Sequence, residues 1–218
     1  MFSAWSVGLP LNIEICSLQL PGRENRLSEL PFTRISTLIL ELVDAISPDL
    51  TKPFAFLGHS MGALIAFELA RELCKQKKPS PFQLIVSGHR APQMHDFSHP
   101  IHALPEDEFI RELRRLNGIP DVVLQHNELM KLVLPVLRAD FEMCETYQYL
   151  EQPLLQTPIL AFGGLQDPKV SQEELAAWRE QTSGPFALQM FVGNHFFLHT
   201  TKMPVIQAIA WHLQQNEH

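Results

Sequence analysis

The feature that most constrains the fold of this 218-residue chain is the stretch Pro53 to Leu73, PFAFLGHSMGALIAFELAREL. A short apolar run at 54–57 meets the pentapeptide GHSMG and passes directly into a helical pattern. This order of strand, sharp turn and helix puts Ser60 at the apex of the turn. Flanking residues without side chains let the strand and the helix approach closely. The G-x-S-x-G spacing therefore predicts an α/β protein with a serine exposed at a strand end.

The same turn gives Ser60 the surroundings of a nucleophile. It holds the hydroxyl clear of the sheet, and the backbone N–H of Met61 points at the place where an oxyanion would form. A chance pentapeptide is the alternative, because G-x-S-x-G alone is a weak pattern. The preceding strand and the small residues along the helix (Ala63, Ala66, Ala70) argue against chance. We interpret Ser60 as a nucleophile and the Met61 N–H as an oxyanion donor.

The composition disfavours several other functions. A net charge of −7 argues against a nucleic-acid partner, because phosphate binding is driven by Lys and Arg. No apolar run approaches the roughly 20 residues of a membrane helix. Residues 1–10 lack the basic start and long apolar stretch of a signal peptide. The cysteines (Cys16, Cys74 and Cys144) are odd in number and far apart, which predicts buried thiols and no disulfide framework. We expect a cytoplasmic monomer.

Alternating strand and helix patterns predict a mostly parallel sheet with helices on both faces. Glycine- and proline-containing turns separate these elements. The expected strands are 13–20 (IEICSLQL), 54–57, 84–87, 158–162 and 186–192. The expected core helices are one capped by Thr33 and ended by Pro48, the helix after Ser60, one at 172–181 capped by Ser171, and one at 204–214.

The segment Gln93 to Thr157 interrupts this rhythm. It contains an amphipathic helix at 106–116 and a longer helix at 128–149 that Pro135 should kink. The longer helix is apolar on more than one side and must bury both sides. We interpret the segment as a helical lid over the serine, with Leu134, Leu137 and Phe141 lining a channel for an acyl chain. Plain packing of an inserted subdomain is the alternative for each single residue. The chain then divides into 1–92 (first part of the core), 93–157 (lid) and 158–218 (second part of the core).

A serine hydroxyl needs an imidazole to take its proton, and the imidazole needs an acid to fix its tautomer. In this architecture the chain order is serine, acid, histidine, each at the carboxyl end of a strand. Asp167 follows the strand 158–162 in a glycine-containing loop, and His195 follows the strand 186–192. Asp167 alone could be a turn former and His195 alone a loop histidine. Their joint order and placement indicate a Ser60–His195–Asp167 triad.

Other histidines fit the base position less well. His89 precedes any suitable acid in the chain order. His59 lies inside the GHSMG turn at 58–62 (the nucleophile elbow), where we expect it to pack or to form a hydrogen bond. No His, Cys and Glu cluster has the spacing of zinc ligands, which disfavours metal catalysis.

With these residues in place, the chain closely resembles the stand-alone (type II) thioesterases of non-ribosomal peptide and polyketide synthesis over nearly its full length. The resemblance implies an α/β-hydrolase fold with a helical lid and no cofactor. It also implies acyl or peptidyl carrier domains as partners, whose phosphopantetheine thiol carries the misprimed or stalled acyl group to be removed. The matching segments are LQLPGRENRLSELPFT (18–33), the elbow stretch, VSGHRAP (86–92), LPVLRADFEMCETYQY (134–149), DPKVSQEELAAWREQTSGPF (167–186) and GNHFFL (193–198).

The chain departs from this family at its start. Family members begin with a further strand and a Phe-Pro-x-x-Gly-Gly-like loop that supplies a second oxyanion N–H, whereas residues 1–5 match the segment directly after that loop. The missing strand would lie between 13–20 and the elbow strand, where each unpaired buried group costs about 1–3 kcal/mol. We therefore expect a truncated chain or a start codon placed too far downstream. Relative to a chain with the upstream segment, we expect poor folding or slower turnover, since one oxyanion donor is worth about 10²–10³ in kcat. Equal stability and turnover would contradict this.

Two other functions compete with a carrier thioesterase. One is a carboxylesterase or lipase that uses the same triad on oxygen esters. The other is a truncated, weakly active protein that still binds carriers. Arg111, Arg114 and Arg115 could meet an acidic carrier surface, although a solvated helix face is the favoured interpretation of their spacing.

Overall fold

The computed structural model describes residues 2–94, 99–116 and 121–215. The chain forms two compact units, each built from separate stretches of sequence. The first unit comprises 1–17, 39–94 and 149–218, and the second comprises 18–38 and 95–148. The unit that contains Ser60 also contains Asp167 and His195, so the predicted triad lies within one compact body.

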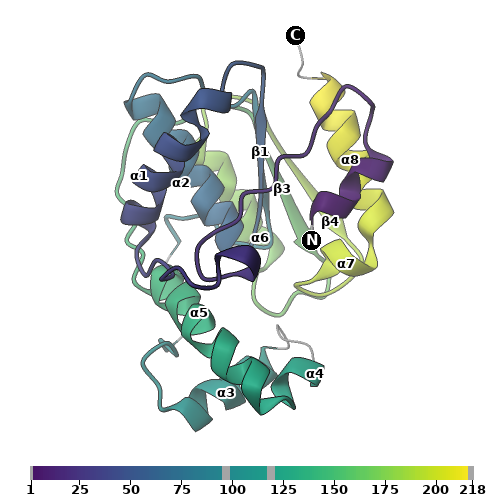
Figure 1. The fold of residues 1–218 in the computed structure, drawn as a ribbon. Helices are drawn as coiled ribbons and strands as arrows, with labels where there is room; N and C mark the ends of the chain where they lie inside the picture. Colours follow the sequence, from purple (N-terminus) through teal and green to yellow (C-terminus); the bar gives the residue numbers. More distant parts are fainter. Residues whose placement is uncertain (1, 95–98, 117–120, 216–218) are drawn as a thin grey trace. The chain divides into compact units, whose positions relative to one another are not determined.

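Four parallel strands form the sheet of the first unit, in the order β1-β2-β3-β4 (Figure 1). The strands are β1 (Ala55–His59), β2 (Gln83–Ser87), β3 (Ile159–Gly164) and β4 (Phe186–Phe191). β2 and β3 are buried along their whole length, as their near-continuous apolar sequences predict for a parallel sheet covered on both faces. The four strands predicted from the elbow onwards are thus confirmed.

The strand predicted at 13–20 is wrong. This segment has no strand assignment, and β1 is paired with β2 alone among the described residues. Ile13 and Ile15 nevertheless pack against the apolar cluster on one face of the sheet. Alternating side chains can therefore bury one face of a segment, but a strand also needs a neighbour for its backbone hydrogen bonds.

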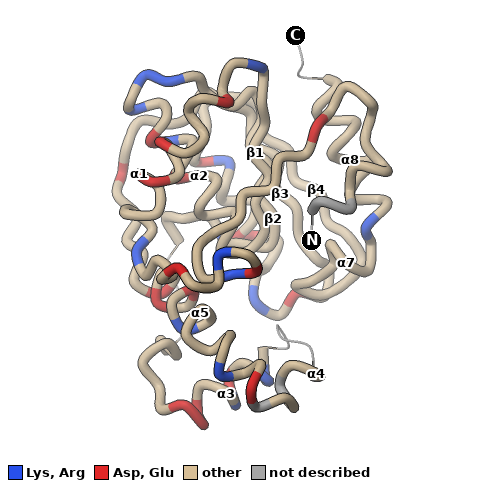
Figure 2. The backbone as a smooth tube through the Cα atoms, in the orientation of Figure 1, with Lys and Arg blue, Asp and Glu red and all other residues tan. Residues whose placement is uncertain are grey.

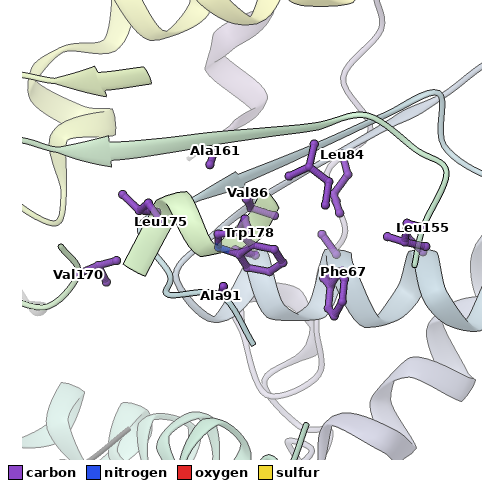
Figure 3. Packing of buried hydrophobic residues seen from close by; sticks show 13 residues of the cluster. Phe67, Leu84, Val86, Ala91, Leu155, Ala161, Val170, Leu175 and Trp178 are labelled. Atoms are coloured by element: carbon purple, nitrogen blue, oxygen red, sulfur yellow. The ribbon is translucent and has the colours of Figure 1, made fainter. Parts of the chain in front are cut away.

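The alternation of side chains along β2 and β3 supplies a core to each face of the sheet. Leu84, Val86 and Ala161 point to one face, where they pack with Phe67 and Trp178 (Figure 3). The partners on this face come from α2 (Met61–Lys75), α6 (Gln172–Ala176) and the 3₁₀ turn η4 (Ala177–Gln181). The small residues of α2 let this helix lie close to the sheet, and the indole of Trp178 meets the Phe67 ring edge-on at 5.2 Å.

The opposite face carries Ile85, Leu160 and Phe162, which alternate with the residues just named. They pack against Phe197 and against the buried side of the last helix. The covering elements are α7 (Phe197–Thr200), α8 (Lys202–Gln215) and the 3₁₀ helix η1 (Phe2–Gly8). Phe197 directly follows the loop that carries His195, so this core also fixes the base of that loop.

The helix predicted at 172–181 is formed in two parts. Ser171 accepts a hydrogen bond from the Glu174 N–H, and the Glu174 carboxylate accepts one from the Ser171 N–H, which completes a capping box. The first part is α6, and the second, η4, is wound as a 3₁₀ helix. The predicted cap at Ser171 is therefore confirmed.

The second unit has a helical core of its own. Phe109, Leu113, Met130 and Leu134 are buried together, and Leu137 and Phe141 pack against them. The helices are α3 (Glu106–Arg115), α4 (Asp121–Leu124) and α5 (Asn127–Glu145), and α5 continues through Pro135. The remaining elements of the chain are η2 (Glu24–Arg26), α1 (Ile35–Ile46) and η3 (Ser47–Asp49).

The cysteine prediction is partly wrong. No disulfide joins the three cysteines, but Cys16 and Cys74 are exposed and Cys144 is half-buried. Cys74 shows the reason, because it lies in the last turn of α2 between the buried Leu73 and the exposed Lys75. Apolar neighbours in sequence do not place a residue on the buried side of a helix.

Candidate active site

The turn between β1 and α2 holds Ser60 in a strained conformation. Its φ of 53° and ψ of −124° lie outside the regions that residues with side chains usually adopt. The Ser60 N–H donates to the Ser87 carbonyl over 2.8 Å, which ties the turn to the end of the neighbouring strand β2. Strain of this kind persists only where the surroundings fix the backbone, as the sheet does here.

The two glycines of the pentapeptide have different roles. A Cβ at Gly58 would lie 1.9 Å from the Gly62 carbonyl oxygen and 2.5 Å from the Ala63 nitrogen, so strand and helix touch through backbone atoms at this point. A Cβ at Gly62 would have no atom within 4 Å. Close approach therefore requires the first glycine, whereas the second is not required by packing in the structure.

Replacing each glycine with alanine tests this difference. Gly58→Ala is expected to lower the free energy of unfolding by about 3 kcal/mol or more, because backbone atoms cannot yield as a side chain would. Gly62→Ala, the matched control at the second residue of α2, is expected to raise it by about 0.4–1 kcal/mol, because alanine has less conformational freedom than glycine in the unfolded chain. Urea unfolding followed by circular dichroism measures both values. Equal destabilisation by the two substitutions would contradict this account of the turn.

The structure brings the three predicted side chains into one hydrogen-bonded line. His195 Nε2 lies 3.1 Å from Ser60 Oγ, and His195 Nδ1 lies 2.8 Å from an oxygen of Asp167. The side chains of His195 and Asp167 are 7% and 1% exposed, so this pair is shielded from water. The geometry suits an imidazole that takes a proton from the serine while the carboxylate fixes its tautomer.

The loops that carry the acid and the imidazole are fastened to each other. The Gln166 N–H donates to the Gly193 carbonyl over 2.9 Å, and the Gln166 side-chain oxygen accepts from the Gly193 N–H over 2.6 Å. Gly193 has a φ of +131°, which favours glycine at this position. A side chain that sequence analysis did not single out, Gln166, thus sets the distance between the two loops.

Hydrogen bonds keep Asp167 ionised. Burial by itself raises the pKa of this carboxyl, but hydrogen bonds from the His195 side chain and from the Lys169 N–H, the latter 2.8 Å long, outweigh burial. The pKa of Asp167 therefore lies below its usual value of 3.8. An ionised acid beside His195 stabilises the imidazolium that forms when the serine loses its proton.

The lowered pKa predicts how Asp167 contributes to stability. Because the folded-state pKa is below that of the unfolded chain, the contribution is fully present above the unfolded value of 3.8 and is lost as pH falls through the folded value. The destabilisation caused by Asp167→Asn is thus expected to be larger at pH 6 than near pH 3. Urea unfolding of both proteins at the two pH values measures the difference. A destabilisation independent of pH would contradict this linkage.

His59 is placed as the sequence analysis expected. Its Nδ1 lies 3.0 Å from the Ser87 hydroxyl, and its ring packs beside His195 with the centroids 5.1 Å apart. It makes no hydrogen bond to Ser60, so it is not positioned as the base. Sequence analysis did not identify Ser87, because a serine that ends a buried strand has no distinctive pattern.

Met61 is the first residue of α2, and the first N–H groups of a helix have no partner inside it. This N–H is thus available to a developing oxyanion beside Ser60. In the described residues, no group of three His, Cys, Asp or Glu side chains is arranged to hold a metal ion. Nor does any helix in that part of the chain combine the length and apolar character needed to cross a membrane.

The predicted lid residues lie in the core of the second unit. Leu134 is buried there, and the Phe141 ring meets Phe109 edge-on at 5.7 Å. This packing supports the alternative of an inserted subdomain core, and the lining of an acyl channel by Leu134, Leu137 and Phe141 stays a prediction.

Two of the three arginines of α3 pair with glutamates of their own helix. Arg115 pairs with Glu112 at 2.8 Å and Arg111 with Glu108 at 3.8 Å, and acidic and basic residues both occur along α3 (Figure 2). Both arginine side chains are about 70% exposed (70% for Arg111 and 71% for Arg115). This arrangement fits a solvated helix face better than a basic docking patch.

A strand–serine–helix turn with an imidazole and a carboxylate from later strand ends defines a serine hydrolase site on an α/β-hydrolase fold. The family model "Thioesterase domain" matches residues 1–214 of the chain. The chain therefore belongs to the thioesterase family.

Named relatives agree with this assignment. The chain is 47% identical to the gramicidin S biosynthesis protein GrsT of Aneurinibacillus migulanus over 213 residues, which cover 98% of this chain and 83% of GrsT. It is 38% identical to thioesterase PikA5 of Streptomyces venezuelae, over 97% of this chain and 75% of that protein. Among solved structures, the type II thioesterase BorB from the borrelidin biosynthetic cluster is similar with a TM-score of 0.88 and 36% identity, covering 97% of this chain and 86% of that one.

Proposed function

We propose that this thioesterase hydrolyses acyl groups from the phosphopantetheine thiol of carrier proteins and so clears misprimed or stalled peptide or polyketide synthases. The observation that carries the proposal is the Ser60–His195–Asp167 line, at 3.1 and 2.8 Å, in a chain that the thioesterase family covers almost completely. GrsT is named for gramicidin S biosynthesis and BorB for the borrelidin cluster, which supports a synthase as the partner.

The geometry supports a two-step mechanism. His195 Nε2 accepts the Ser60 proton as Oγ attacks the thioester carbonyl carbon, and the carbonyl electron pair moves to oxygen. When that pair returns, the C–S bond breaks and the pantetheine sulfur leaves with the proton from His195. Water, deprotonated by the same nitrogen, then attacks the acyl-Ser60 ester, and Ser60 regains its proton as the acid product leaves.

Asp167 and Met61 support both steps. The Asp167 carboxylate accepts a hydrogen bond from His195 Nδ1, which leaves Nε2 free to receive the serine proton. The oxyanion forms beside the start of α2, where the Met61 N–H can donate to it. We assign Ser60 as nucleophile, His195 as base, Asp167 as orienting acid and Met61 as oxyanion donor.

The partner and location form the finer part of the proposal. The substrate is an acyl or peptidyl carrier domain that brings its own phosphopantetheine arm, so the thioester is presented as part of a protein. A cytoplasmic location agrees with exposed free thiols at Cys16 and Cys74, since cytoplasmic thiols are kept reduced.

The test compares two substrates that carry the same acyl group. One is the acyl thioester of a holo-carrier protein, and the other is the corresponding oxygen ester of a small alcohol. A carrier thioesterase is expected to show the higher kcat/KM on the carrier thioester, with a free pantetheine thioester as the control for carrier contacts. Hydrolysis of the oxygen ester without hydrolysis of either thioester would contradict the proposal and favour a carboxylesterase. Carrier binding without turnover of any substrate would favour a weakly active binding protein.

A further inference from the structure

We propose that His59 is a positioning residue for the catalytic imidazole: its ring, anchored to the sheet by Ser87, is the wall against which His195 and the following residues pack. The proposal rests on the assignment of Ser60, His195 and Asp167 given above. It gives a role to a buried histidine that the mechanism itself does not use.

The His59 ring packs beside three consecutive residues: His195 and Phe196 of the loop that carries the base, and Phe197 at the start of α7. Its centroid lies 5.1 Å from that of His195, with the rings tilted by 44°. It lies 6.4 Å from the Phe196 ring and 6.0 Å from the Phe197 ring, which it meets edge-on at 82°. Because Phe197 is itself buried in the core that α7 and α8 form on one face of the sheet, the His59 ring packs against both the His195 loop and this core.

The neighbouring strand end leaves room for both imidazole rings. Gly88, with a φ of +58°, follows β2, and a Cβ there would lie 2.6 Å from His59 Cε1 and 3.4 Å from His195 Cε1. A residue with a side chain at this position would displace the His59 ring first. The absence of a side chain at Gly88 therefore allows the two rings to pack closely.

Ser87 connects His59 to the rigid part of the molecule. Its side chain is completely buried, and its hydroxyl lies 3.0 Å from His59 Nδ1. Its carbonyl accepts the Ser60 N–H over 2.8 Å. One residue at the end of β2 thus holds both the nucleophile's backbone and the ring that supports the base.

His59 stays neutral in this position. Burial is the largest cause that lowers its pKa to about 3, followed by the charge of His195, and His199 adds to the lowering. Asp167 and the backbone of His195 oppose the shift without overcoming it. A neutral His59 ring does not repel the imidazolium that His195 becomes when it takes the serine proton, whereas a protonated His59 ring would. The interaction of His59 with the His195 backbone does not have the geometry of a normal hydrogen bond at Nε2 within the described part of the chain, so the anchor is the 3.0 Å bond from Nδ1 to Ser87.

Three substitutions separate the packing of the His59 ring from its hydrogen bond to Ser87. His59→Ala removes both, His59→Phe keeps a ring without the bond to Ser87, and Ser87→Ala keeps the ring and removes the bond. Val43→Ala, on the buried face of α1, is the matched control for a loss of packing away from the site. The measurements are kcat and KM on an acyl-carrier thioester, the thermal midpoint, and the rate at which a fluorophosphonate labels Ser60.

His59→Ala is expected to lower kcat and the labelling rate about 10- to 100-fold with KM within about twofold, because a displaced base loses its reach to Ser60. His59→Phe and Ser87→Ala are expected to give smaller and similar losses, and their double variant is expected to be no worse than either, because both remove the same bond. Val43→Ala is expected to lower the thermal midpoint alone.

Two results would overturn the proposal. One is a folded His59→Ala enzyme with an unchanged kcat and an unchanged labelling rate at Ser60. The other is a pair of losses in His59→Phe and Ser87→Ala that multiply in the double variant. If the unsubstituted enzyme is not labelled at Ser60, the assignment of the nucleophile fails instead, which distinguishes that failure from a failure of the His59 proposal.

Discussion

Replacing Ser60 with alanine is expected to lower kcat for acyl-carrier hydrolysis by about 10⁵-fold or more, because the acyl-enzyme cannot form without the hydroxyl. The substitution removes one oxygen and leaves the Ser60 backbone bond to Ser87, so the turn should keep its conformation. KM is expected to change little, since carrier and acyl contacts remain.

The exposed Ser80, in the loop before β2, provides the matched control. Ser80→Ala is expected to leave both kcat and stability unchanged. Turnover is measured as release of free holo-carrier thiol over hours, which detects slow residual rates. A Ser60→Ala enzyme within tenfold of the unsubstituted rate would exclude Ser60 as the nucleophile.

Replacing Asp167 with asparagine is expected to lower kcat by about 10⁴-fold, with little change in KM. The amide has almost the size of the carboxylate but can donate a hydrogen bond to His195 Nδ1. This interaction stabilises the tautomer with a proton on Nε2, the nitrogen that faces Ser60 at 3.1 Å and must be free to accept. The loss of the negative charge also removes stabilisation of the imidazolium.

The exposed Asp44 of α1 is the control for the loss of one carboxylate. Asp44→Asn is expected to retain full activity. Steady-state rates on the same acyl-carrier thioester measure both variants, and the labelling of Ser60 by a fluorophosphonate shows whether the nucleophile has lost activation. Full labelling and turnover in Asp167→Asn would mean that another group orients His195.

The sequence predicted those elements that depend on short-range or periodic patterns of residues. The strands of this parallel sheet appear as short apolar runs in the sequence, so β1 to β4 could be placed within a residue or two. Asp167 and His195 could be proposed together because each follows such a run and the order along the chain is restricted by the fold. The cap at Ser171 was predictable because its partner, Glu174, is three residues away.

Features that depend on distant partners were missed or misplaced. Residues 13–20 alternate as a strand would, yet their backbone has no neighbouring strand to pair with among the described residues. The roles of Gln166 and Ser87 come from bonds to Gly193 and His59, which are 27 and 28 residues away in sequence. Such contacts leave no periodic trace in a single sequence, so only the three-dimensional arrangement identifies them.

The most direct test of the central claim is the mass of the enzyme during turnover of an acyl-carrier thioester. A sample quenched within milliseconds is analysed by intact mass and by peptide mapping. The proposed mechanism predicts a mass increase equal to the acyl group, located on the peptide that contains Ser60 and absent in Ser60→Ala. Complete hydrolysis that proceeds equally fast in Ser60→Ala, with no acylated peptide at any time, would contradict it.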